Sequence, residues 1–270
     1  MKTIFLGELR LNLKALFIWS IVIGSFGFIC ILLYESMQGD MREMADAFSS
    51  MGAFSDAFGM STLSIATLKG YFAAEIGTIH SLGSGMFAAV TAIGILSKEE
   101  EGHTGEFLLS LPITRKKVVL SKGLCVLFSL IIFTCICAFF YSMGFIVLDE
   151  ELPAKEFLKF MYYQFLMNIE IAGICFGISS ISGKNRMGIG IGIAILFYGF
   201  DLIGRIIPDL KEYLFLGPYS YANASAIFSG ADTPEKAVAM AAFLTSVGIL
   251  FLHICSSVQI QDHLLLKPGM

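Results

Sequence analysis

Long apolar runs, each near the length needed to cross a membrane, alternate with short polar segments along the chain. Residues 15–34, 76–97, 123–148 and 237–261 contain no Asp, Glu, Lys or Arg. A fifth run, 160–183, is interrupted only by Glu170, and a sixth begins at 187 and extends past Asp201. A helix needs about 20 residues to cross the hydrocarbon core, and unbroken apolar runs without alternation favour helices over a barrel. The pattern predicts an all-α membrane protein with six transmembrane helices.

Composition agrees with a single membrane domain over residues 1–270. Of the 270 residues, 56% are hydrophobic and 15% are charged, and the mean hydropathy is +0.77. Soluble domains average about 25% charged residues. No separate soluble domain is expected, and the net charge of −4 argues against a nucleic-acid partner.

The distribution of Lys and Arg predicts the orientation. With both termini inside, eleven of the 18 Lys and Arg residues lie on the inner side, in the shorter segments. The positive-inside rule therefore places both termini and the 98–122 loop in the cytoplasm, and makes 35–75 and 201–236 extracellular segments. Residues 1–14 are predicted to form a basic amphipathic helix on the inner surface that leads into the first crossing.

The 98–122 loop has its own structure in this prediction. Its run GEFLLSL is amphipathic and ends at Pro112, which cannot continue a helix. On a helix, Phe107, Leu108 and Leu111 share one face, whereas Glu106 and Ser110 lie on another. A short helix with one apolar face, joined to two membrane helices, suits docking onto a soluble partner.

The same loop resembles the segment after the second membrane helix of ABC-2 type transporter permeases, the transmembrane subunits of ABC transporters. That family shows an acidic residue, Gly-Thr, Glu with a Leu pair, a small residue, Pro and a basic residue. This chain carries Glu101, Gly102 and Thr104 (with His103 inserted, as in many members), Glu106, the pair Leu108-Leu109, Ser110, Pro112 and Arg115, and then Ser121-Lys122.

The resemblance implies a fold, partners and site residues. It implies an ABC-2, type V exporter-like permease fold, a coupling helix that rests on a separate ABC ATP-binding subunit, and a second permease copy or related permease in the same bilayer. It also implies export of a hydrophobic or amphipathic substrate, such as a drug, antimicrobial peptide or lipid-like compound, across the bacterial cytoplasmic membrane, and hence drug or peptide resistance. The ATPase-coupling residues expected from it are Glu101, Gly102, Thr104, Glu106, Phe107, Leu108, Leu111, Pro112 and Arg115.

No catalytic chemistry is expected of this chain itself. It has no G-x-x-x-x-G-K-[ST] phosphate loop, so ATP and Mg²⁺ are expected on the partner subunit and no cofactor on the chain. Its six cysteines lie in predicted spans without a C-x-x-C step, and are expected to be packed thiols rather than metal ligands.

Glu170 is the acidic residue deepest in a predicted span. A charge at mid-bilayer is costly, so Glu170 is expected to be neutral, paired or facing water. It is a candidate for the translocation path, with a single interhelical hydrogen bond as the alternative. The steps Gly173/Gly177 and Gly188/Gly192 predict close helix packing, within the subunit or between subunits.

Two other classes of function stay open at this point. One is an intramembrane enzyme such as a protease, and the other is an ATP-independent carrier or channel. The protease motifs fail in detail, because no Glu-Glu pair is followed by Arg at the required position and the segment LGSG at 82–85 has Leu where Gly-x-Ser-Gly needs Gly. Topology does not separate a carrier or channel from an ABC permease.

Overall fold

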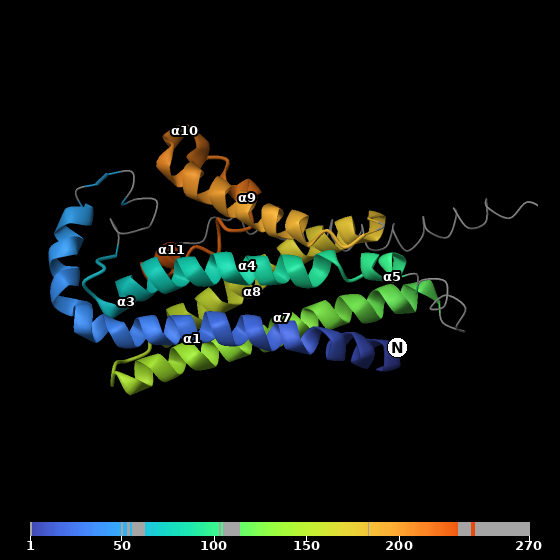
Figure 1. The fold of residues 1–270 in the computed structure, drawn as a ribbon. Helices are drawn as coiled ribbons and strands as arrows, with labels where there is room; N and C mark the ends of the chain where they lie inside the picture. Colours follow the sequence, from blue (N-terminus) through green and yellow to red (C-terminus); the bar gives the residue numbers. More distant parts are fainter. Residues whose placement is uncertain are drawn as a thin grey trace, which may run out of the picture.

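The computed structural model describes residues 2–49, 51–52, 55, 63–102, 104, 114–182, 184–231 and 239–240. Figure 1 shows these residues as a bundle of long helices lying side by side. Within the described part, five helical segments are long and apolar enough to cross a membrane. They are α1 (Lys2–Ser49), the continuous α3, η1 and α4 (Leu68–Tyr71, Phe72–Ile76 and Gly77–Ile93), α7 (Arg115–Val147), α8 (Ala154–Ile181) and α9 (Met187–Ile206).

These segments agree with five of the six predicted crossings, so the all-helical membrane fold is confirmed to that extent. The sixth predicted crossing, 237–261, lies outside the described residues except for positions 239 and 240. The orientation of the termini stays a prediction.

Successive spans run in opposite directions, so the polar segments gather at the two ends of the bundle. The N-terminus, the short helix α5 (Ser97–Glu101) and the start of α7 share one end. Helices α3 and α10 (Pro208–Lys211) lie toward the other end (Figure 1). The predicted loop 98–122 therefore begins and ends beside the N-terminal turns of α1.

Helix α1 is continuous, so the predicted interfacial segment 1–14 leads into the first crossing without a break. It packs along α7: the rings of Phe5 and Phe128 are 5.8 Å apart. Farther along, a Cβ on Gly27 would lie 2.3 Å from Cε1 of Tyr141. Glycine at position 27 is thus required by the close approach of the two helices, as small residues are in other membrane bundles.

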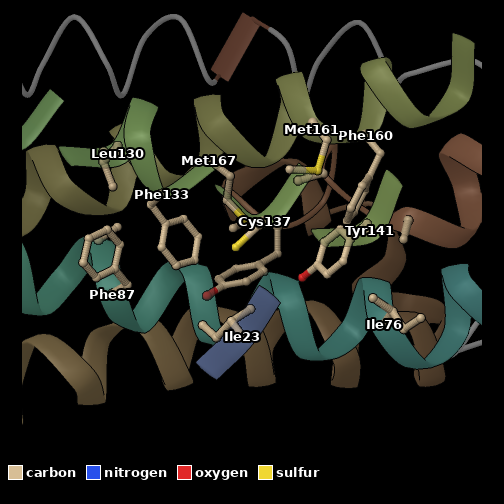
Figure 2. Close-up of a cluster of buried hydrophobic side chains, with 14 of the residues drawn as sticks. Ile23, Ile76, Phe87, Leu130, Phe133, Cys137, Tyr141, Phe160, Met161 and Met167 are labelled. Carbon is tan, nitrogen blue, oxygen red and sulfur yellow. The ribbon is translucent and has the colours of Figure 1, made fainter. Parts of the chain in front are cut away.

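The centre of the bundle is aromatic. Phe72, in the π-helical segment η1, contacts the rings of Tyr141, Phe160 and Phe228 at centroid distances of 5.6, 6.0 and 5.3 Å. Figure 2 shows the neighbouring part of this core, where side chains from α1, α4, α7 and α8 interdigitate. This packing joins the spans into one unit and leaves the polar groups at defined places between them.

The chain between α9 and the end of the described residues is broken into short pieces, as its prolines and glycine predict. After α10 come the 3₁₀ turn η2 (Leu214–Leu216) and α11 (Ala224–Phe228). The linking residues 217–223 fold back against the bundle, and Tyr219 and Tyr221 are buried. Asn223 caps α11, because its side chain accepts a hydrogen bond from the backbone N–H of Ala226 at 2.8 Å.

Candidate functional site

Four charged side chains meet at the end of the bundle where the 98–122 loop begins and ends. We call Glu8, Lys98, Glu99 and Lys122 the Glu8 cluster. Lys122 Nζ donates hydrogen bonds to Glu8 Oε1 at 2.5 Å, to Glu99 Oε1 at 2.8 Å and to the backbone carbonyl of Ile95 at 2.7 Å. Lys98 Nζ donates to the second oxygen of Glu8. The cluster joins α1, the end of the second span, α5 and α7.

Two members of the cluster lie in the interior, whereas Lys98 and Glu99 are partly exposed. Lys122 is 1% exposed and Glu8 is 5% exposed. A lysine is almost never fully buried unless it is paired, and all three protons of this ammonium group have acceptors. Two carboxylates and two ammonium groups leave no net charge, which makes their burial tolerable.

Glu99 links the cluster to the loop itself. Its Oε2 accepts a hydrogen bond from the hydroxyl of Thr104, and its backbone carbonyl accepts from the Thr104 N–H at 2.9 Å. Burial alone would raise the pKa of Glu99, but the hydrogen bonds from Lys122 and Thr104 and the charges of Lys122 and Lys98 outweigh it and lower the pKa below 4.5. Glu99 is therefore ionised at neutral pH.

Helix α5 is fixed to the remaining helices as well. Ser179 Oγ in α8 accepts hydrogen bonds from the N–H groups of Leu96 and Ser97, at 3.0 and 3.2 Å. Glu101 Oε2 accepts from the N–H of Asn185, in the turn before α9, at 3.0 Å. The first residues of the loop are thus connected to α1, α7 and α8 and to the turn before α9.

The expected ATPase-coupling residues fall partly within this site. Glu101 is exposed at the end of α5, Gly102 closes the turn with its N–H on the Lys98 carbonyl at 2.9 Å, and Thr104 contacts Glu99. Arg115 begins α7. The positions outside the described residues are Glu106, Phe107, Leu108, Leu111 and Pro112.

Glu8 and Glu99 are the members of the site that the sequence did not indicate. In the predicted amphipathic segment 1–14, Glu8 looks like one more surface charge, whereas Lys122 was noted only as part of the family resemblance. The sequence does contain one hint: Glu8 is the only acidic residue among the four charged residues of segment 1–14. Its burial follows from the distant pairing with Lys98 and Lys122.

A cavity of about 150 Å³ lies next to the Glu8 cluster, between α1, α4, α7 and α9. Its walls combine the rings of Trp19 and Phe87 with polar groups of Asn12, Thr91 and Lys98. The cavity is thus largely apolar with a few polar groups, which suits an amphipathic molecule better than a hydrophilic one.

Glu170 lies in α8, away from the Glu8 cluster, and is 2% exposed. Its Oε1 accepts a hydrogen bond from the hydroxyl of Tyr221 at 2.6 Å, whereas Oε2 has no partner among the described residues. One turn and a half earlier, Gln164 Nε2 donates to the Ala222 carbonyl at 2.8 Å and to Ser81 Oγ at 2.6 Å. Two side chains of α8 therefore hold the 217–223 segment in place.

The predicted packing glycines occupy different environments. Gly177 is buried and Gly173 partly buried in α8. In α9, a Cβ on Gly188 or Gly192 would meet no atom of the described residues within 4 Å. The contact of α9 with α4 runs instead through Gly190, where a Cβ would lie 3.1 Å from Ile93. Close packing at 188 and 192 stays a prediction.

Among the described residues, no three His, Cys, Asp or Glu side chains come together as a possible metal site. His80, the histidine buried in α4, is instead 2.9 Å from the hydroxyl of Tyr141. The hydrogen bond of His80 thus joins α4 to α7.

Comparison with known families gives one match. The profile of a family described as ABC-2 family transporter protein matches residues 3–256, which is nearly the whole chain. No curated protein matches the chain.

Proposed function

The chain belongs to the ABC-2 family of transporter proteins, and we propose that it is the permease subunit of an ABC exporter. Membership makes it a multi-pass membrane component of a transporter rather than a catalyst, and the family works with ABC ATP-binding partners in general. In this proposal a separate subunit hydrolyses ATP with Mg²⁺, two permeases pair in the bacterial cytoplasmic membrane, and the coupling helix of the 98–122 loop contacts the ATP-binding subunit.

The observation that carries the proposal is the way the loop is anchored. Both ends of the 98–122 segment are joined through ion pairs, with the partly exposed Lys98 and Glu99 before the loop and the buried Lys122 after it. A loop that only connected two spans would need no such anchoring, whereas a loop that receives force from a partner does. The family match over residues 3–256 also favours a transporter over an intramembrane enzyme.

A hydrophobic or amphipathic substrate is supported by the cavity beside the Glu8 cluster. Trp19 and Phe87 provide apolar walls, and Asn12, Thr91 and Lys98 provide polar groups. Such a lining matches compounds with an apolar body and a polar end. Export, rather than import, rests on the family resemblance.

Purification from native cells is the experiment that tests this function. The tagged chain should co-purify with an ATP-binding subunit that carries a phosphate loop. ATP hydrolysis by that complex in liposomes should rise with a panel of amphipathic dyes and peptides, and should not rise with sugars. A chain that purifies without any ATP-binding subunit would point to an independent carrier or channel.

Orientation gives a first prediction. In a variant without native cysteines, Met51→Cys should react with a membrane-impermeant maleimide in intact cells. Thr104→Cys should react only after the membrane is permeabilised, because the 98–122 loop is expected in the cytoplasm. Labelling of position 104 in intact cells would reverse the topology and remove the loop from reach of an ATP-binding subunit.

Glu170 gives a second prediction, as the proposed side chain on the translocation path. Glu170→Gln should keep the fold, because an amide can still accept the Tyr221 hydroxyl, but should change the turnover or the order of preferred compounds. Glu170→Leu should in addition lower the free energy of unfolding by about 1 kcal/mol, the usual size of one hydrogen bond between membrane helices.

Tyr221→Phe is the matched control for Glu170, because it removes the same hydrogen bond but keeps the carboxyl group. It should show the loss of stability without the change in preference. ATP hydrolysis should also be measured with each compound in Glu170→Leu and normalised to the amount of folded protein. If the compounds stimulate it as in wild type, Glu170 has a structural role only.

A further inference from the structure

The carboxylate of Glu8 is bonded to both ends of the loop at once. Its Oε2 accepts a hydrogen bond from the ammonium group of Lys98, at the start of the loop, and its Oε1 accepts one from that of Lys122, at the end of the loop. Glu8 itself belongs to neither end, because it lies in the second turn of α1. Figure 1 shows the N-terminal turns of α1, helix α5 and the start of α7 together at this end of the bundle.

Two other contacts between this part of α1 and α7 are less directional than an ion pair. Phe5 meets Phe128 edge to face, and Asn12 Nδ2 lies 3.8 Å from Cys125 Sγ. Apolar packing is not directional in itself, although the interlocked side chains of α1 and α7 also pass motion from one helix to the other. Charge-assisted hydrogen bonds are short and have fixed geometry. Displacement of α5 would therefore reach α1 directly through the bond between Lys98 and Glu8, and Glu8 adds a directional bond to the packing between α7 and α1.

We propose that Glu8 is the positioning residue through which the 98–122 loop moves the first membrane helix. A force on the loop displaces Lys98 and Lys122 together, because Glu99 also binds Lys122. Both lysines then draw the same carboxylate, and the first crossing follows, because it continues from Glu8 without a break in the helix. The cavity beside the cluster changes shape with that motion, because Asn12 and Trp19 of α1 form one of its walls.

Stability alone is a poor explanation for this arrangement. Buried ion pairs can often be replaced by apolar residues of similar volume with little or no loss of stability. What an apolar replacement loses is a bond of fixed direction from one helix to two others. The inference rests on the proposed function, because the force on the loop is taken to come from an ATP-binding subunit.

The motion can be measured without knowing the transported compound. In a cysteine-free background, spin labels are placed at Leu11→Cys on α1 and Met187→Cys at the start of α9, both exposed positions. The complex with the co-purifying ATP-binding subunit is compared without nucleotide and after trapping with ATP and vanadate. The label-to-label distance distribution should shift on trapping in the wild-type background.

Glu8→Gln should lower the ratio of shifted to unshifted population by about tenfold, a usual size for coupling between separate sites. Glu8→Asp, which keeps the charge, should recover part of the shift. Arg10→Gln removes a charge from an exposed position two residues after Glu8 on the same helix. It should match wild type. A purely structural Glu8 would lower the yield of folded complex in Glu8→Gln without changing this ratio.

Lys98→Met provides a second route if Glu8→Gln does not fold, because Lys98 is partly exposed and its loss leaves the Lys122 pair intact. It should also reduce the shift. A wild-type shift in either Glu8→Gln or Lys98→Met would overturn the inference, as would an α1 that does not move on trapping. Failure of the wild-type chain to bind any ATP-binding subunit would instead overturn the proposed function.

Discussion

Phe107→Glu is expected to separate the chain from its ATP-binding subunit while leaving it folded in the membrane. Phe107, Leu108 and Leu111 form the apolar face of the predicted coupling helix, and a carboxylate in the desolvated centre of a contact costs several kcal/mol. A loss of about 3 kcal/mol weakens association by roughly a hundredfold. The measurement is the amount of ATP-binding subunit recovered per permease after affinity purification.

Ser110→Glu is the matched control, because it adds the same charge to the same predicted helix outside the apolar face. It should leave recovery of the ATP-binding subunit near wild type, and Leu108→Glu should behave like Phe107→Glu. Equal recovery with Phe107→Glu and Ser110→Glu would show that the 107–111 face does not contact the ATP-binding subunit, and the coupling helix would have to be sought elsewhere.

The crossings could be predicted from sequence because a bilayer imposes a simple rule. A spanning helix needs a continuous apolar run of sufficient length, and 15–34, 123–148 and 160–183 meet that rule without any knowledge of their neighbours. The actual helices are longer, since α1 runs from Lys2 to Ser49. Helix ends depend on local backbone hydrogen bonds and on packing, to which an apolar count is blind.

The Glu8 cluster could not be predicted in the same way. The free energy of a charged side chain depends on whether an opposite charge meets it, and Glu8 and Lys122 are 114 residues apart in sequence. Sequence did place Lys98 and Lys122 at the two ends of an important loop, and the resemblance singled out Thr104. The sequence does not reveal the contacts by which Glu99 joins Thr104 to Lys122.

Glu170 shows the opposite situation. Its cost in a bilayer made it stand out in sequence, but its partner did not, because Tyr221 lies in a segment predicted to be an outer loop. The fold-back of residues 217–223 brings the tyrosine hydroxyl to the carboxylate. Likewise, Gly24 and Gly27 of α1 pack against the rings of Phe140 and Tyr141 on α7, and neither was predicted as a packing glycine.

Lys122→Met is expected to lower the free energy of unfolding strongly. Methionine fits the space of the lysine stem but leaves Glu8 buried with one partner fewer and Glu99 without its main one. Removing one partner of a buried ion pair costs about 3–5 kcal/mol. Lys117→Met, an exposed change on the same helix, should stay within about 0.5 kcal/mol of wild type. Thermal unfolding followed by the fluorescence of the single tryptophan, Trp19, measures both.

The dependence on pH separates lost charge pairing from lost packing in Lys122→Met. In wild type the pKa of Glu99 is lowered, so its contribution to stability is complete above pH 4.5 and disappears as the pH falls through the lowered pKa. Without Lys122, burial is expected to raise the pKa of Glu99. Protonation of Glu99 as the pH falls then removes the free-energy cost of a carboxylate that has lost its partner. The difference in melting temperature between wild type and Lys122→Met should therefore shrink between pH 7 and pH 4.

The triple variant, in which Lys122→Met is combined with Glu8→Gln and Glu99→Gln, should recover most of the lost stability at pH 7, because no carboxylate is then left without a partner. A difference that is constant with pH, or a triple variant no better than Lys122→Met, would mean that Lys122 stabilises the fold through the packing of its stem alone.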